Sequence, residues 1–184
     1  MTDRTQTPLV QLKDISISFG GIKAVDHVSL DLYPGEVVGL HVEPADAVAC
    51  PEAVQAIGSA EAIVLGPGSW FTSVLAPLLV PGIADAVAGS PGRVVVVLNL
   101  EEQPGETSGF SPQRHLEVLA AQFPSLRVDT VLADPRRVPD IEALAAASAA
   151  LGAGLVIAPV ASRDGSARHD VDLLASAFGG IFSA

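Results

Sequence analysis

The sequence predicts an α/β protein, with an incomplete Rossmann-like parallel sheet that carries helices on both faces and follows an antiparallel β-hairpin. Short apolar runs alternate with helical patterns from about residue 51 to the end of the chain, which is typical of a parallel sheet with crossover helices. Hydrophobic residues make up 49% of the 184 and aromatic ones only 4%, so aliphatic side chains must fill the core.

The first forty residues predict a small antiparallel unit. Residues 9–18 alternate between polar and apolar side chains, and residues 25–32 form a second strand beyond the turn at Gly20 and Gly21. Residues 37–40 form a third, apolar strand.

The next elements lead into and out of a glycine loop. Pro51 suits the first turn of a helix over residues 51–60, and the apolar residues 62–65 read as a buried strand. The loop Gly66-Pro67-Gly68 follows, and Ser69 can cap a helix that includes residues 72–75. Another short helix covers residues 83–88.

Three strand–helix pairs complete the pattern. The expected strands are residues 93–98, 127–133 and 155–160, all rich in β-branched residues. The expected helices are residues 111–123, 139–151 and 169–178. Ser111 and Pro112 form a cap and first position, Gly152 stops the second helix, and Asp170 and Asp172 favour the start of the third.

Charge and cysteine content narrow the function classes. The net charge of −11 argues against DNA, RNA or an anionic membrane as the main partner, because no basic patch is present to release counterions. Cys50 is the only cysteine, so an internal disulfide is excluded and a cytoplasmic setting is expected. The longest apolar stretch, residues 75–80, is too short to span a bilayer and is interrupted by Pro77, so we expect no membrane insertion.

The glycine loop is the main candidate site. A strand that enters a helix through glycines places N–H groups and the positive end of the helix at the carboxyl edge of the sheet, where phosphates bind. The candidate phosphate or sugar contacts there are Gly66, Pro67, Gly68, Ser69, Thr72 and Ser73. The alternative is a tight turn selected for packing alone.

Two further polar residues follow buried strands and should lie at the same edge. Asn99 and Asp134 could contact ribose, base or metal, but both are also ordinary turn residues. His115 is expected to be a surface or packing residue, because no acid or nucleophile pairs with it. We predict no catalytic residue, and the four histidines do not form a ligand-spaced cluster for zinc.

Residues 9–40, LVQLKDISISFGGIKAVDHVSLDLYPGEVVGL, resemble the start of an ABC transporter ATP-binding subunit. The P-loop that this resemblance implies is absent, because His41-Val42-Glu43 follows and no lysine occurs after Lys23. Alanine becomes abundant only beyond Leu40. We therefore expect two units of different origin, residues 1–41 as an ABC-like fragment without ATPase activity and residues 42–184.

Residues 42–184 resemble the carboxyl-terminal half of the gluconeogenesis-factor family in the 2-phospho-L-lactate transferase superfamily. The resemblance rests on EPADAVACPEAVQAIGSAEAIVLGPGSWFTSVLAPLLVPGIADAV, VVVVLNLEEQPGETSGFSPQRHLEVL and VLADP. It implies a cytoplasmic protein that binds UDP-N-acetylglucosamine or UDP-glucose and links carbon supply to cell shape, with no established turnover. It also implies ligand contacts at Glu106, Thr107 and Arg168; for Glu106 and Thr107 the alternative is that they cap the helix that follows. We assign no cofactor, apart from the Mg²⁺ that a transferase of this superfamily would need.

Three functions remain open at this point. The first is a UDP-sugar-binding protein, expected to bind weakly because the glycine-rich loop with which full family members start is not in the sequence. The second is a transferase of the phospholactyl type, in which Asp134 or Glu106 holds Mg²⁺. The third is an ABC-subunit fragment. In the first case one apolar edge of the sheet must be covered by the strands of residues 9–40, by a second copy of the chain, or by nothing, and we expect a tendency to self-associate as a homodimer.

Overall fold

The chain divides into two compact units, Met1–His41 and Val42–Ala184, and each is described by itself. The structure is a computed structural model, and it describes residues 7–8, 10–19, 22–33 and 48–183. The predicted strand at residues 37–40 and the turn at Gly20 and Gly21 lie outside these residues.

The first unit is an antiparallel hairpin of β1 (Val10–Phe19) and β2 (Ile22–Leu32). The second strand starts three residues earlier than the sequence predicts. The register slips between Leu12 and Ile15 on β1. Asp14 and His27 both have positive φ angles, and the Asp14 carboxylate lies 2.5 Å from Nδ1 of His27, so this pair marks the irregularity.

The second unit contains a four-stranded parallel sheet in the order β3-β4-β5-β6, which confirms the predicted fold class. Its strands are β3 (Ala62–Leu65), β4 (Arg93–Val97), β5 (Thr130–Ala133) and β6 (Gly154–Ile157). All four strands therefore deliver their following loops to one carboxyl edge.

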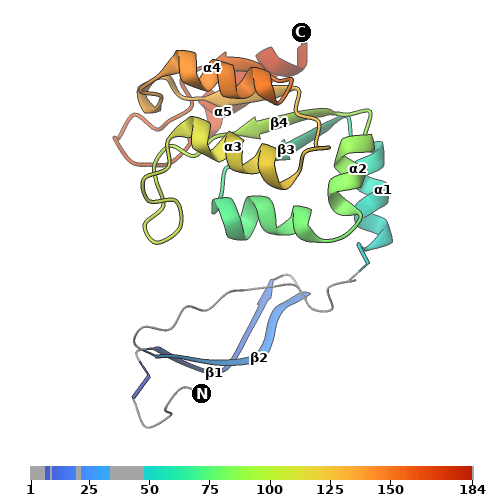
Figure 1. Ribbon diagram of the computed structural model, residues 1–184, viewed down its shortest axis with the longest axis vertical. Coiled ribbons are helices and arrows are strands. Elements are labelled where there is room, and N and C mark those ends of the chain that lie inside the picture. The colour runs from blue at the N-terminus through green and yellow to red at the C-terminus, as the bar shows by residue number, and fades with distance from the viewer. Residues whose placement is uncertain (1–6, 9, 20–21, 34–47, 184) are drawn as a thin grey trace. The chain divides into compact units, whose positions relative to one another are not determined.

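Most helices cover one face of this sheet (Figure 1). These are α1 (Pro51–Ser59), the π-helical and 3₁₀ turns η1 (Trp70–Leu75) and η2 (Ala76–Leu79), α2 (Ile83–Gly89), α3 (Pro112–Gln122) and α4 (Ile141–Ala150). Val94 and Val96 of β4 point into the core on this side, together with Trp70 and Leu116. The core on this face is mainly aliphatic, with the aromatic rings of Trp70 and Phe123 buried in it.

Helix α5 (Val171–Ser183) covers the other face. Val95 and Val97 of β4 and Leu132 of β5 pack there against Ile181. Successive residues of β4 thus point to opposite cores, which explains why all four residues after Arg93 in this strand are valines.

The helix starts follow the capping residues in the sequence. Ser111 accepts a hydrogen bond from the N–H of Arg114, and Asp140 accepts one from the N–H of Ala143. Asp170 accepts the N–H groups of Asp172 and Leu173, so it caps α5 rather than lying in the first turn. These side chains satisfy N–H groups that have no partner inside the helix.

Three predicted elements of the second unit differ from the structure by three residues or more at one end. The strand predicted over residues 155–160 ends at Ile157. The strand predicted from residue 127 begins at Thr130, because the Asp129 carboxylate accepts the N–H of Val94 and Arg127 donates to the carbonyl of Gly92. The last helix continues past Gly179 and Gly180 to Ser183, five residues beyond the predicted end. There Ile181 is buried in the second core, so packing outweighs the low helix propensity of glycine.

Among the described strands the sheet has two edges, β3 and β6, and the β3 edge carries an exposed apolar side chain. There β3 pairs with β4 only, and Val64 in its centre is 42% exposed.

No single described helix is long and apolar enough to cross a bilayer. The bent pair Trp70–Leu79 and Ile83–Gly89 meets the length and composition criteria only when its two parts are taken together.

Candidate functional site at the carboxyl edge of the sheet

The glycine loop leaves β3 at a position that only glycine can occupy. Gly66 has a φ angle of +81°, and a Cβ atom there would lie 2.8 Å from the carbonyl oxygen of Val97. Both conditions exclude a side chain. The loop therefore passes close to the end of β4.

Asn99, two residues after β4, holds this loop from the other side. Its Oδ1 accepts the N–H of Gly68 at 3.2 Å, and its Nδ2 donates to the carbonyl of Gly68 at 2.8 Å. The same Nδ2 also donates to Oε1 of Gln103 at 3.2 Å. Asn99 is thus an internal brace between two neighbouring strand ends.

The loop that follows Asn99 covers the start of the helical segment Trp70–Leu79. Gln103 Oε1 accepts the N–H of Trp70 at 3.0 Å. Glu106 Oε1 accepts the Ser69 hydroxyl at 2.6 Å, the N–H of Phe71 at 2.8 Å and the N–H of Thr72 at 3.2 Å. The donors that the sequence predicts for a phosphate are therefore bound to side chains of this chain.

These hydrogen bonds decide the protonation of Glu106. Burial alone would raise the pKa of its carboxyl group, but the Ser69 hydroxyl and the N–H groups of Phe71 and Thr72 hold the pKa below the usual value. Glu106 is a carboxylate at neutral pH, placed at the positive end of the helical segment.

Asp134, which follows β5, is a second polar hub. Its side chain is fully buried, and it accepts the N–H groups of Val160 at 2.9 Å and Ala161 at 2.8 Å. Arg136 donates to it from the backbone and from the guanidinium group. Burial would raise the pKa of Asp134, yet these donors lower it far below its usual value.

This hub fixes the segment that carries Arg168. Arg136 also donates to the carbonyl of Ala161 at 2.7 Å, and the carbonyl of Arg168 accepts the N–H of Ser162 at 2.8 Å. The Arg168 side chain is 80% exposed, with Asp164 at 3.7 Å. Its guanidinium group is therefore available to a ligand.

These segments enclose a pocket of about 830 Å³, here called the rim pocket. Three segments of the chain line it. They are Pro67-Gly68-Ser69, then Asn99 to Pro104 with Glu106, and finally Ala167-Arg168-His169.

The charges in the rim pocket are mixed. Glu101, Glu102 and Glu106 contribute carboxylates, and Arg168 contributes a guanidinium group. Each carboxylate has a partner: Glu101 pairs with Arg137 at 2.9 Å, and Glu102 accepts the N–H of Gly109 at 2.6 Å. Arg168 makes a long ion pair with Asp164, at 3.7 Å, so its guanidinium group is the lining group best able to receive an anion.

The predicted ligand residues separate into two groups. Six of them line the rim pocket: Pro67, Gly68, Ser69, Asn99, Glu106 and Arg168. The other five do not line the pocket and contact other parts of the chain. Gly66 makes the turn, Asp134 is the buried hub, Thr107 is fully buried, Thr72 donates its N–H to Glu106, and Ser73 donates its N–H to the Ser69 carbonyl.

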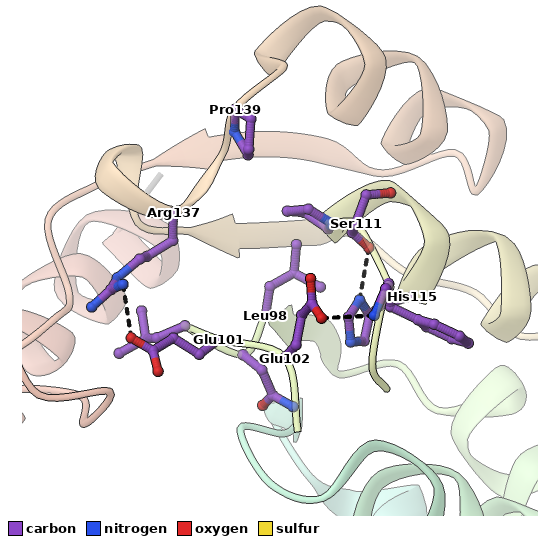
Figure 2. Close-up of a pocket in the computed structure, with 12 residues that line it drawn as sticks. Leu98, Glu101, Glu102, Ser111, His115, Arg137 and Pro139 are labelled. Carbon is purple, nitrogen blue, oxygen red and sulfur yellow. Dashed lines mark hydrogen bonds and ion pairs between the residues drawn. The ribbon is translucent and has the colours of Figure 1, made fainter. Parts of the chain in front are cut away.

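A second pocket of about 650 Å³ adjoins the first and shares residues 99–102 with it. Figure 2 shows His115 at its wall, with Nδ1 2.9 Å from the Ser111 carbonyl, and the Arg137–Glu101 ion pair on the opposite side. His115 is 5% exposed and stacks edge-to-face on Trp70. Burial lowers its pKa, so it is a neutral packing residue, in line with the sequence prediction.

The residues present do not form a metal site in the described part of the chain. No group of three or more His, Cys, Asp or Glu side chains is placed there to hold an ion. Both oxygens of Asp134 are engaged by protein donors, and so is Oε1 of Glu106. The Mg²⁺ that a transferase would need therefore has no prearranged ligand set in these residues.

Sequence reasoning missed three residues of this region. The Gln103 side chain accepts the N–H of Trp70, and the Arg136 side chain donates to the carbonyl of Ala161. Both partners lie far along the chain from the side chain that binds them. His169 lines the rim pocket, and its Nε2 is buried without a hydrogen-bond partner in the described residues. Only Arg136 had a visible signal, because it follows Asp134 by two residues in a strand-end turn.

The chain is similar to proteins of one known family. Residues 1–158 match the family model of the 2-phospho-L-lactate transferase CofD. A protein named as a gluconeogenesis factor in Mycobacterium tuberculosis is 43% identical over 157 residues, which is 84% of this chain and 46% of that protein. The gluconeogenesis factor of Bacillus subtilis is 37% identical over 90 residues, or 49% of this chain and 28% of that protein.

A solved structure gives the same result for the fold. A UPF0052 family member from Bacillus halodurans superposes with a TM-score of 0.63 at 31% identity, covering 73% of this chain and 48% of that one. The chain thus spans about half the length of the curated relatives that match most of it. The family match includes residues 1–41, so the ABC-type origin of that segment stays a prediction.

Proposed function

The chain belongs to the 2-phospho-L-lactate transferase CofD family, and from this premise we propose that its rim pocket binds a UDP-sugar, UDP-N-acetylglucosamine or UDP-glucose. The observation that carries the proposal is the convergence of the glycine loop, Asn99 and Arg168 on one pocket at the carboxyl edge of a parallel sheet. Ligands of open α/β sheets bind at such edges.

The chemistry of the pocket suits the parts of this ligand. Arg168 can pair with the diphosphate, because a guanidinium group offers two parallel N–H donors to phosphate oxygens. The side-chain amide of Gln103 suits sugar hydroxyls, which both donate and accept, whereas both backbone groups of Gly68 are already bonded to Asn99. At about 830 Å³ the pocket is within the range of small-molecule sites.

We propose a binding and regulatory role in the cytoplasm, linked to carbon metabolism and cell shape. In the rim pocket the Ser69 hydroxyl donates to Glu106, but this hydroxyl and the N–H groups of Phe71 and Thr72 lower the pKa of the Glu106 carboxyl group, which makes it a weak base. We therefore favour binding over turnover. The relatives are named as gluconeogenesis factors, which supports the metabolic part of the proposal.

Calorimetric titration with UDP-N-acetylglucosamine tests the proposal, with UDP-glucose and ATP plus Mg²⁺ as comparison ligands. We expect saturable binding of the UDP-sugars and none of ATP. Absence of saturable binding of either UDP-sugar at millimolar concentration would refute the proposal. ATP binding instead would favour the ABC-fragment alternative for residues 1–41.

A second candidate, a transferase of the phospholactyl type, is favoured by the family description alone. It requires turnover that depends on Mg²⁺. The oxygens of Asp134 are already saturated by protein donors, so Glu106 would have to leave Ser69 to hold the ion. Phospholactyl transfer that stops on removal of the metal would establish this candidate.

We also propose that the free edge at β3 mediates self-association as a homodimer. The strand Ala62–Leu65 contains no charge or proline to block pairing, and its own residue Val64 is exposed. A second copy of the same strand would satisfy its free backbone groups.

A further inference from the structure

The carboxylate of Glu106 lies at the place where the sequence predicts a ligand phosphate. Its Oε1 collects the Ser69 hydroxyl at 2.6 Å and the N–H groups of Phe71 at 2.8 Å and Thr72 at 3.2 Å. A negatively charged oxygen with one hydroxyl and two backbone donors is also the environment of a bound phosphate oxygen.

This arrangement has a consequence for an anionic ligand. The three donors cannot serve Glu106 and a phosphate at once, and the carboxylate would repel a phosphate placed beside it. A diphosphate in the rim pocket must therefore take these donors from Glu106 or avoid them.

We propose that Glu106 is a resident competitor, and that the phosphate of a bound nucleotide displaces its carboxylate from Ser69, Phe71 and Thr72. This inference rests on the proposed function and adds the means by which the affinity of the same pocket is set. The exchange conserves the number of charge-assisted hydrogen bonds, so the ligand gains only the difference between two anions. We therefore expect the wild-type chain to bind the nucleotide weakly.

The loop is built so that the side chain can leave alone. Thr107 is fully buried, its hydroxyl oxygen accepts the N–H of Gln103 at 2.8 Å, and its own N–H donates to the carbonyl of Gln103 at 2.9 Å. These bonds hold the backbone on both sides of Glu106 without its carboxylate. A change of side-chain rotamer therefore releases the donors while the loop stays in place.

The experiment titrates UDP into the wild type, Glu106→Gln, Glu106→Ala and Glu102→Gln. Glu102→Gln is the matched control, because it removes the same charge from the same pocket without touching Ser69, Phe71 or Thr72. We expect both Glu106 variants to bind UDP about 10-fold more tightly than the wild type, the size of one hydrogen bond to a charged group. Glu102→Gln should show a smaller gain from the lost repulsion.

Equal gains in Glu106→Gln and Glu102→Gln, or weaker binding by the Glu106 variants, would overturn the inference while the proposed function stands. No UDP binding by any of the four proteins would refute the proposed function itself. A second measurement guards against misfolded variants: the backbone amide signals of Phe71 and Thr72 must shift when UDP is added to the wild type. Unchanged signals at saturating UDP would show that the phosphate avoids these donors.

Discussion

Asn99 and Gly68 exchange two hydrogen bonds, from the Gly68 N–H to Oδ1 and from Nδ2 to the Gly68 carbonyl. Beyond the end of β3, the Asn99 side chain thus supplies the hydrogen-bond partners that a neighbouring strand would supply within the sheet. The glycine loop is held at the carboxyl edge of the sheet by this one amide, and the rim pocket forms around it.

Replacing Asn99 by Ala should loosen this loop. Both backbone groups of Gly68 lose their partner, so we expect the free energy of unfolding to fall by about 1–3 kcal/mol and binding of UDP-N-acetylglucosamine to weaken. Urea unfolding and calorimetric titration measure the two effects. Asn99→Asp keeps the acceptor and loses the donor, so its free energy of unfolding should lie between those of the wild type and Asn99→Ala. An Asn99→Ala variant as stable as the wild type would contradict the bracing role.

Asp134 should be a stability residue with a defined pH dependence. Its pKa is lowered in the folded state, so its contribution is complete above the unfolded value of about 4 and is lost as the pH falls below that value. We expect Asp134→Ala to lose about 3 kcal/mol at pH 7, because it leaves Arg136 and two buried N–H groups without an acceptor.

Urea unfolding at pH 7 and pH 3 checks this, with Asp134→Asn as the uncharged control. The stability difference between the wild type and Asp134→Asn should shrink towards pH 3. A difference that is the same at both pH values would show that the charge of Asp134 does not stabilise the fold.

Arg168 should matter for ligand binding and little for folding. Its side chain is exposed and makes one long ion pair, so Arg168→Ala should leave the melting temperature nearly unchanged. We expect UDP-N-acetylglucosamine to bind about 10-fold more weakly, because the diphosphate loses its guanidinium partner. Arg163→Ala, in the same loop but outside the lining of the rim pocket, is the matched control and should bind like the wild type.

The free edge of the sheet gives a prediction on assembly. Val64→Lys places a charge on an edge strand, which disfavours pairing with another chain. We expect light scattering after size exclusion to show a smaller mass for this variant than for the wild type. Val171→Lys adds the same charge at an 81% exposed position on α5 and should not change the mass. Identical masses for all three proteins would remove the edge as an interface.

The order of elements after residue 50 could be predicted because each has a local signal. The β-branched run of β4, the Ser111-Pro112 start of α3 and the glycine after α4 each specify one element by backbone preference or burial. The end of α5 could not, because two glycines break the local pattern and only the contact of Ile181 with the second core explains the extra turn.

The position of two candidate residues could be predicted, while their role in ligand binding stays a prediction. Strand ends locate Gly68 and Asn99 at one edge, since parallel strands share that edge. Arg168 was indicated by the family resemblance alone, and it lies well beyond the end of β6 and before α5. Nothing in the sequence shows that Glu106 and Gln103 occupy the N–H groups of residues 70–72, because these bonds join positions more than thirty residues apart. Asp134, predicted as a ligand residue, accepts the N–H groups of Val160 and Ala161 instead. These partners also lie far along the chain, so the sequence does not reveal them.

The most direct test of the account is to map backbone amide signals while UDP-N-acetylglucosamine is added to the wild-type chain. We predict that the shifted signals cluster at Gly68, Ser69, Asn99 and residues 167–169, the three segments that line the rim pocket. Shifts confined to other surfaces, such as α5, or no shifts at saturating ligand, would contradict it.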